Sequence, residues 1–261
     1  SQSRRKAVSK QSKTLIKLIV LGVLTVFATI PVIAFGWFSN NNGISASGTG
    51  VTVKSSGLEI RSERNGADIS VLEPSEEMKH IKNMIYDDED KISPSSSGYF
   101  EFYVHNANEE EYGFVFNAAV KNNEFSVGEG FKTPSDAASR EKALKYINSH
   151  IMMFTEYKDG VYSGYIPTDG SVKREVTKDN DGGHVVVYWI WIAYYDEIFT
   201  DKKNIIEESA RKEIADYYSK EENRAKMFEG DEADENGYNQ ADCVIGTTIQ
   251  HICFALNVWE D

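Results

Sequence analysis

Five histidines are the side chains with the clearest potential for catalysis or metal binding in this sequence. None forms a His-x-His pair or the zinc-protease pattern of two histidines four residues apart on a helix. The sequence also contains no Cys-x-x-Cys, no Gly-x-Ser-x-Gly and no phosphate-binding loop. Because a site needs convergent partners, we predict no catalytic residue, no metal site and no cofactor. The histidines are His80, His105, His150, His184 and His251.

Two acidic segments resemble the beginning of a calcium-binding loop. In residues 232–237, Glu-x-Asp-x-Asn-Gly, the first position is Glu, and the twelfth falls on Cys243, where a bidentate Glu belongs. In residues 177–188 the same test places Thr177 first and Tyr188 twelfth. The acidic run over residues 87–90 fits the pattern less well. We therefore interpret all three as solvated loops.

The N-terminal part of the sequence has the pattern of a leader. Residues 18–38 carry no charge, and that length is about what a helix needs to cross a bilayer. Six basic residues precede this stretch, and no acidic residue occurs before Glu59. A basic flank followed by an apolar run predicts an export signal whose N-terminus stays inside the cell. We expect the rest of the chain to work outside the cytoplasm.

Two fates of the leader are open. Pro31 ends the apolar helix, and Val32-Ile33-Ala34 fits the small-x-small site of a signal peptidase, with Phe35 as the new N-terminus. A cut after Gly36 would instead make Trp37 the first residue. The alternative is an uncleaved anchor, in which Phe35, Trp37 and Phe38 lie at the outer membrane interface, where aromatic rings are favoured.

Composition limits the partners of the exported part. The whole chain has a net charge of −13, and residues 1–34 hold six of its 28 basic residues and none of its 41 acidic ones. The remainder is therefore strongly acidic, and we expect no nucleic-acid partner. Cys243 and Cys253 are the only cysteines. On one extended strand they would lie about 30 Å apart, too far to pair, so we expect them to be buried as small hydrophobic residues.

Alternation of apolar and polar residues predicts most of the fold as β-strands. Residues 99–105 and 112–120 alternate clearly, and we expect them to pair as a hairpin. A strand, a turn and a second strand are predicted for residues 51–60. The same pattern is predicted for residues 151–166, where Lys158-Asp159-Gly160 supplies the turn. The apolar segment 243–259 is expected to form one long strand or a kinked pair.

Residues 185–195 are apolar on both faces of the predicted strand, so a further element must cover the outside of their sheet. A helix over residues 200–228 can supply the cover, because Ile206, Ala210, Ile214 and the tyrosines after them form one apolar stripe. A second helix is predicted over residues 134–149, with Thr133 as its N-cap and Pro134 in its first turn. A short helix is also possible within residues 74–86.

The order of these elements resembles the TasA/camelysin family of exported Gram-positive proteins. Three segments carry the resemblance. A leader ending at Ala34 is followed by an aromatic start, a polar spacer and the sequence Ser-Ala-Ser-Gly-Thr at residues 45–49, which leads into a strand. Residues 99–106, Tyr-Phe-Glu-Phe-Tyr-Val-His-Asn, and the terminal residues 256–259 provide the other two. The resemblance covers both ends of the chain, and the acidic helix 200–228 is an insertion relative to it.

The resemblance implies a jelly-roll-like antiparallel β-sandwich over residues 44–261, with helical insertions near residues 134–149 and 200–228. It also implies extracellular biofilm-matrix fibres, in which each subunit donates its mature N-terminal segment, residues 35–43, as a strand to the next copy. Such a subunit contacts the membrane only transiently, through residues 18–38, and signal peptidase cuts it between Ala34 and Phe35.

In that mechanism Phe35, Trp37 and Phe38 belong to the donated strand. Asn40, Asn41, Asn42 and Gly43 form the link to the body of the protein. A sheet with an unpaired edge accepts such a strand, because its main-chain groups lack partners.

Two other functions stay open. One is a membrane-anchored extracellular module that binds a ligand or a host glycan through its loops. The other is a secreted metallopeptidase, since some members of the family have been described as such.

Overall fold

The computed structural model describes residues 44–53, 57–62, 64, 71–72, 79–82, 91–120, 124–125, 136–179, 182–200, 205–231 and 233–261. The chain divides into two compact units, Ser1–Asn42 and Gly43–Asp261. All of the described residues belong to the second unit, and the fold below is the fold of that unit.

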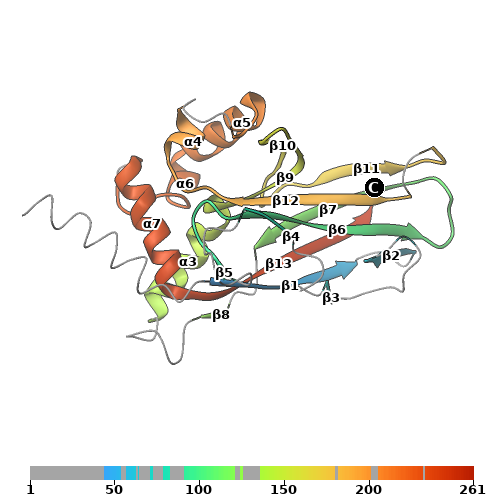
Figure 1. Ribbon diagram of the computed structural model, residues 1–261, viewed down its shortest axis with the longest axis horizontal. Helices are drawn as coiled ribbons and strands as arrows, with labels where there is room; N and C mark the ends of the chain where they lie inside the picture. The colour runs from blue at the N-terminus through green and yellow to red at the C-terminus, as the bar shows by residue number, and fades with distance from the viewer. Residues whose placement is uncertain are drawn as a thin grey trace, which may run out of the picture. The chain divides into compact units, whose positions relative to one another are not determined.

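Within the described residues the strands form two sheets, one of seven strands and one of six (Figure 1). The seven-stranded sheet has the order β11-β7-β13-β1-β3, with β5 also paired to β1 and β8 to β13. Its strands are β1 (Ile44–Val53), β3 (Val71–Leu72), β5 (Lys91–Ile92), β7 (Tyr112–Val120), β8 (Glu124–Phe125), β11 (Val172–Val176) and β13 (Ile249–Glu260).

The six-stranded sheet has the order β10-β9-β12-β6-β2, with β4 also paired to β6. Neighbouring strands are antiparallel in both sheets, except for the parallel pair of β1 and β13. The strands are β2 (Leu58–Arg61), β4 (Lys79–Lys82), β6 (Ser97–Asn106), β9 (Ile151–Lys158), β10 (Val161–Ile166) and β12 (His184–Trp191). The predicted mainly-β class with helical insertions is confirmed.

The core lies between the two sheets and follows from the alternation along their strands. Phe100, Phe102 and Val104 of β6 are fully buried, while the residues between them are only half-buried. The ring of Phe102 meets Phe116 of β7 edge-on at 5.8 Å, and Phe100 lies 5.7 Å from Phe254 of β13. Aromatic pairs at these distances add to the stabilisation from burial alone.

One predicted strand pairing is wrong, although both strands exist. Residues 99–105 and 112–120 are predicted to form a hairpin, yet β6 belongs to the six-stranded sheet and β7 to the seven-stranded one. The strands predicted within residues 51–60 exist as β1 and β2, and they too belong to different sheets. The apolar faces of β6 and β7 therefore meet across the core, as in a packed pair of sheets. The hairpin of β9 and β10 is confirmed, and its turn places Asp159 and Gly160 at φ of 52° and 86°.

Five helices occur in the described part of the chain, and Figure 1 shows them gathered at one end of the sheets. They are α3 (Ala137–His150), α4 (Asp196–Phe199), α5 (Glu208–Ser219), α6 (Glu221–Arg224) and α7 (Glu235–Thr248). The expected N-cap of α3 is wrong. The helix is capped by Asp136, whose carboxylate accepts from the Ser139 amide at 2.7 Å, and Thr133 lies outside the described residues.

The predicted cover over residues 185–195 is confirmed. Ile206, Ala210 and Ile214 pack with Ile190 and Ile192 in a second apolar cluster on the outer face of the six-stranded sheet. The cover is not one helix, however. Within it Ile206 forms a β-bridge with Tyr162 of β10, and α5 and α6 follow as separate helices.

Four further expectations are wrong. Residues 243–259 form neither one strand nor a kinked pair of strands, because α7 continues to Thr248 and β13 begins at Ile249. Cys243 therefore lies on a helix and is exposed rather than buried. The possible helix over residues 74–86 contains strand β4 instead. The strand expected over residues 185–195 ends at Trp191, and α4 follows it.

Candidate functional site

The residues predicted to act in assembly all lie outside the described part of the chain. These are the donor residues Phe35, Trp37 and Phe38, the linker residues Asn40, Asn41, Asn42 and Gly43, and the cleavage residues Ala34 and Phe35. The described residues can therefore supply only the other half of the predicted mechanism, a sheet edge that accepts a strand.

The outer edge of β1, here called the β1 edge, has the required character. One side of this ten-residue strand pairs with β13 from Ser45 to Val53. On its other side only Ile44, Ser45, Thr49 and Gly50 have partners in the described chain, supplied by the two-residue strands β5 and β3. Within the described residues, the outer side of β1 is therefore only partly paired, and main-chain groups at a sheet edge are a template for another strand.

The other edges in the described chain are better protected. At β10, the Tyr162 amide donates to the Ile205 carbonyl and the Tyr162 carbonyl accepts from the Glu207 amide, both at 2.8 Å. β11 exposes the charged side chains Lys173, Arg174 and Glu175. β2 is only four residues long. Bridging segments, charged side chains and short length all disfavour pairing with another chain.

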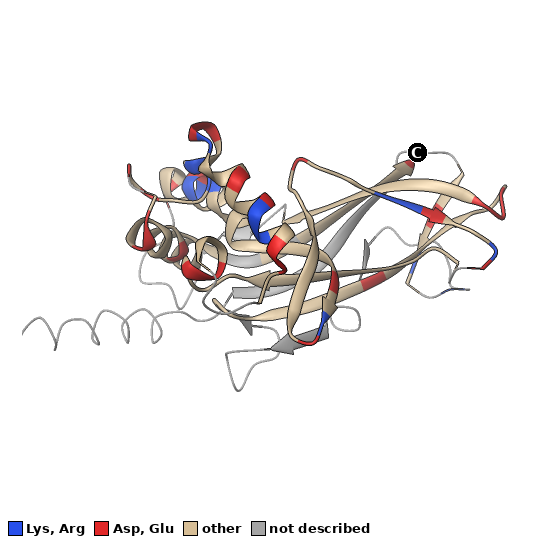
Figure 2. Ribbon diagram, turned by 90° about the horizontal axis from the view of Figure 1, so that it is seen from above, with Lys and Arg blue, Asp and Glu red and all other residues tan. Residues whose placement is uncertain are grey.

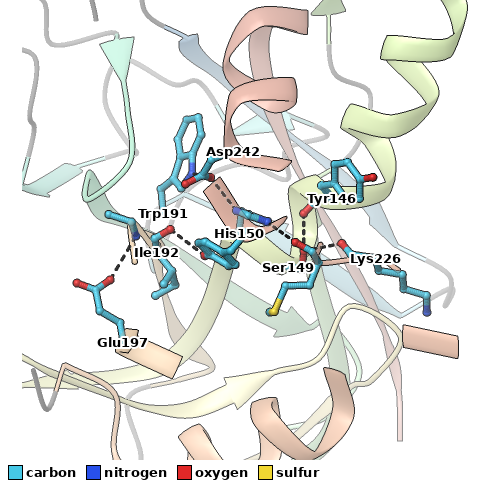
Figure 3. A network of polar contacts seen from close by, with 11 residues as sticks. Tyr146, Ser149, His150, Trp191, Ile192, Glu197, Lys226 and Asp242 are labelled. Atoms are coloured by element: carbon cyan, nitrogen blue, oxygen red, sulfur yellow. Dashed lines mark hydrogen bonds and ion pairs between the residues drawn. The ribbon is translucent and has the colours of Figure 1, made fainter. Parts of the chain in front are cut away.

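A second candidate site is a buried polar cluster beneath the helices (Figure 3). His150 ends α3, and its Nδ1 lies 2.7 Å from Asp242 Oδ1 on α7. The same carboxylate oxygen accepts from Trp191 Nε1 at 2.8 Å, at the end of β12. His150 Nε2 lies 3.0 Å from the carbonyl of Met227, and its ring stacks on Tyr238 at 4.1 Å. Four separate segments therefore meet at this cluster, three of them at the imidazole and β12 through Asp242.

The contacts of this cluster do not join a nucleophile to a base. His150 Nδ1 lies within hydrogen-bond distance of a carboxylate oxygen, and Nε2 of a backbone carbonyl oxygen. The neighbouring Ser149 Oγ lies 2.7 Å from the carbonyl oxygens of Tyr146 and of Lys226, and its single O–H donates to one of them rather than to the imidazole. A nucleophile needs a hydrogen bond to its base, so Ser149, His150 and Asp242 do not act as a triad.

Sequence reasoning missed Asp242, because it placed this residue between an acidic loop and a strand. Two features of the sequence nevertheless indicate a helix that contains Asp242. Asp234 is a good N-cap residue, and its carboxylate accepts from the Gly237 amide at 2.8 Å. Tyr238, Ala241 and Ile245 follow at helical spacing, and all three are buried.

The remaining histidines lie on several different strands. His105 and His184 lie on the outer face of the six-stranded sheet, and His80 and His251 lie in β4 and β13. Among the described residues, no three His, Cys, Asp or Glu side chains are grouped so that they could hold a metal ion. The carboxylate of Asp234, in the first calcium-like segment, caps α7. Residues 180–181 and 87–90 lie outside the described part.

No protein-family model, no curated protein and no solved structure matches this chain. None of the described helices is both long enough and apolar enough to span a bilayer.

Proposed function

We propose that this protein is an exported structural subunit of a cell-surface or biofilm-matrix fibre. Its leader, residues 1–34, directs export, and the segment that follows, residues 35–43, is donated as a strand to a neighbouring copy. The body is a sandwich of the jelly-roll type that carries the acceptor. The protein performs no catalysis in this role, and its principal partner is itself.

The observation that carries the proposal is the β1 edge. Residues 35–43 run directly into Ile44, the first residue of β1. Because residues 40–43 form the link, the part that pairs is residues 35–39, which span about 16 Å at the rise of a β-strand. One copy therefore supplies a short donor strand, and the next copy supplies an edge on which only four residues have partners within the described chain.

Strand donation also suits the chemistry of the two parts. Main-chain hydrogen bonds give affinity in this mode, and side chains on alternate positions give specificity. Phe35 and Trp37 occupy alternate positions of the donor, so both rings can face the same side of the added strand. Their burial on a neighbour would contribute roughly 2–3 kcal/mol each.

The experiment compares two purified forms by electron microscopy, the chain from residue 35 and the chain from residue 39. We expect fibres from the first form and folded monomers with the same circular dichroism spectrum from the second. The variant Asn41→Ala, which changes the linker and keeps the aromatic rings, is expected to retain fibres. Fibres from the chain that begins at residue 39 would reject strand donation.

The intact mass of the native protein separates this proposal from an anchored binding module. An N-terminus at Phe35 or Trp37 supports assembly, whereas retention of residues 1–34 supports the anchor.

A further inference from the structure

The outer face of the six-stranded sheet carries a row of aromatic side chains beyond the part that the helices cover. Tyr99 and Tyr103 lie on β6, and Tyr188 and His184 lie opposite them on β12. Tyr157 of β9 extends the row at one end. These five residues, here called the aromatic strip, are all half-buried. None of them has a role in the strand donation proposed above.

The rings of the strip lie next to one another across strands. The Tyr99 and Tyr188 centroids are 5.8 Å apart, and Tyr157 lies 5.9 Å from Tyr188. The Tyr103 and His184 rings stack at 4.6 Å with an interplanar angle of 17°. The two cross-strand pairs are four residues apart on each strand, or about 13 Å at the rise of a β-strand. The strip is therefore an extended row of two separate ring pairs, one stacked face to face and the other tilted by 42°.

The sheet holds these rings rigidly. Phe100, Phe102 and Val187, which alternate with the strip residues on β6 and β12, are fully buried in the core between the sheets. Their packing fixes the strands and with them the directions of the outward side chains. A preformed surface loses little conformational entropy when it binds a ligand.

Polar groups accompany the rings. A groove of about 410 Å³ runs beside Tyr157, Tyr188 and His184, and its volume falls in the usual range for ligand sites. Glu156, Lys158 and Arg174 also line it, so the groove offers both donors and acceptors. Next to it, His184 Nε2 lies 3.1 Å from Glu101 Oε2, within the strip itself.

We propose that the aromatic strip binds a neutral polysaccharide. A sugar ring presents C–H groups on its flat face and hydroxyls around its rim. The electron-rich face of an aromatic ring attracts the C–H groups, and the carboxylate and cationic side chains of the groove bind the hydroxyls. Two ring pairs about 13 Å apart favour an oligosaccharide, because a single sugar cannot contact both pairs.

The local charge argues for a neutral chain. The strip and its groove carry two carboxylates, Glu101 and Glu156, and two cationic groups, Lys158 and Arg174. A surface with balanced charge gives neither a polyanion nor a polycation a net attraction. Figure 2 shows both signs of charge interspersed over the helices and along the strands.

Binding is measured by titration calorimetry with two probes, cellohexaose and chitohexaose. The full chain is kept in solution with lauryldimethylamine oxide, a detergent without a sugar headgroup. We expect the chain to bind at least one of the two hexasaccharides. The double variant Tyr99→Ala, Tyr188→Ala should weaken that binding at least tenfold, and Tyr188→Phe should keep most of it because the ring remains.

The matched control is Tyr194→Ala, which removes a tyrosine 49% exposed and outside the strip. It is expected to leave binding unchanged. The circular dichroism spectrum of each variant checks that it has folded. The proposal is overturned if the wild-type chain binds neither hexasaccharide, or if the double variant binds as tightly as the wild type. A change in the oligomeric state of the double variant with unchanged sugar binding would also overturn it, because it would assign the strip to contacts between copies.

Discussion

His150 and Asp242 place an ionisable pair in the interior, where α3, α7, β12 and the segment after α6 meet. The His150 side chain is fully buried, and that of Asp242 is 6% exposed. Replacing a buried pair by apolar residues is often neutral, but removing one partner leaves the other without compensation. The pair therefore favours the arrangement that brings the four segments together, because each side chain is costly to bury without the other.

The variant Asp242→Ala should lower the free energy of unfolding by about 3 kcal/mol, because it leaves the His150 ring and Trp191 Nε1 without their acceptor. Urea unfolding followed by tryptophan fluorescence measures the change. The control Gln240→Ala, at an exposed position on the same helix, should change stability by less than about 0.5 kcal/mol. Equal effects of the two variants would contradict the role of the pair.

At the scale of secondary-structure elements, α3 is hydrogen-bonded to the segment that links α6 to α7. The Lys142 ammonium and the Tyr146 hydroxyl, both on α3, donate to the two carboxylate oxygens of Glu229. These hydrogen bonds hold the pKa of Glu229 below its ordinary value of 4.5. Burial, together with the Glu229 carboxylate, raises the pKa of Tyr146. The contact therefore depends on the charged form of Glu229.

A carboxyl group whose pKa is lowered by folding stabilises the protein above its unfolded-state pKa, and this contribution is lost as the pH falls through the folded value. The variant Glu229→Gln should therefore lower the free energy of unfolding by about 1 kcal/mol at pH 7. Its difference from the wild type should shrink as the pH falls below about 4.5. Urea titrations at several pH values test this. Glu222→Gln, on exposed α6 surface, should show no such trend, and a pH-independent difference for Glu229→Gln would refute the explanation.

The positions of the strands could be predicted from sequence better than the pairing between them. Tyr99 to His105 alternate so regularly that the strand and its buried face followed directly, and the cover over Ile190 and Ile192 followed from an apolar run on both faces. Alternation fixes which side chains are buried but not which strand lies alongside. The pairing of β6 with β12, and the parallel pairing of β1 with β13, depend on contacts far apart in sequence.

The error at α7 has a different cause. A short apolar run is ambiguous between helix and strand, and residues 243–259 contain the end of α7 and all of β13 except its last residue, Glu260. Asp242 could not be recognised as a partner of His150 until it was placed on the helix. The aromatic strip was partly visible in sequence, since Tyr99 and Tyr103 lie on the polar side of a predicted strand. The groove beside it includes Arg174 of the other sheet, and no sequence pattern connects that residue with the strip.

At the scale of the whole molecule, the two proposed functions use separate surfaces. The β1 edge, the proposed acceptor, lies in one sheet, whereas the aromatic strip lies on the outer face of the other sheet. A fibre built through the β1 edge would keep the strip available along its length. The acidic charge of the chain keeps such subunits soluble before assembly.

The central claim is that each copy donates residues 35–43 as a strand to the β1 edge of its neighbour. A free peptide of residues 35–43 should therefore compete with the donor segment for that edge. The direct measurement is the rate of fibre growth, by light scattering, of the chain from residue 35 in the presence of a synthetic peptide of residues 35–43. We predict that an excess of the peptide slows growth and leaves monomers, while a scrambled peptide of the same composition has no effect. Growth that is unchanged by the peptide, or slowed equally by both peptides, would contradict strand donation.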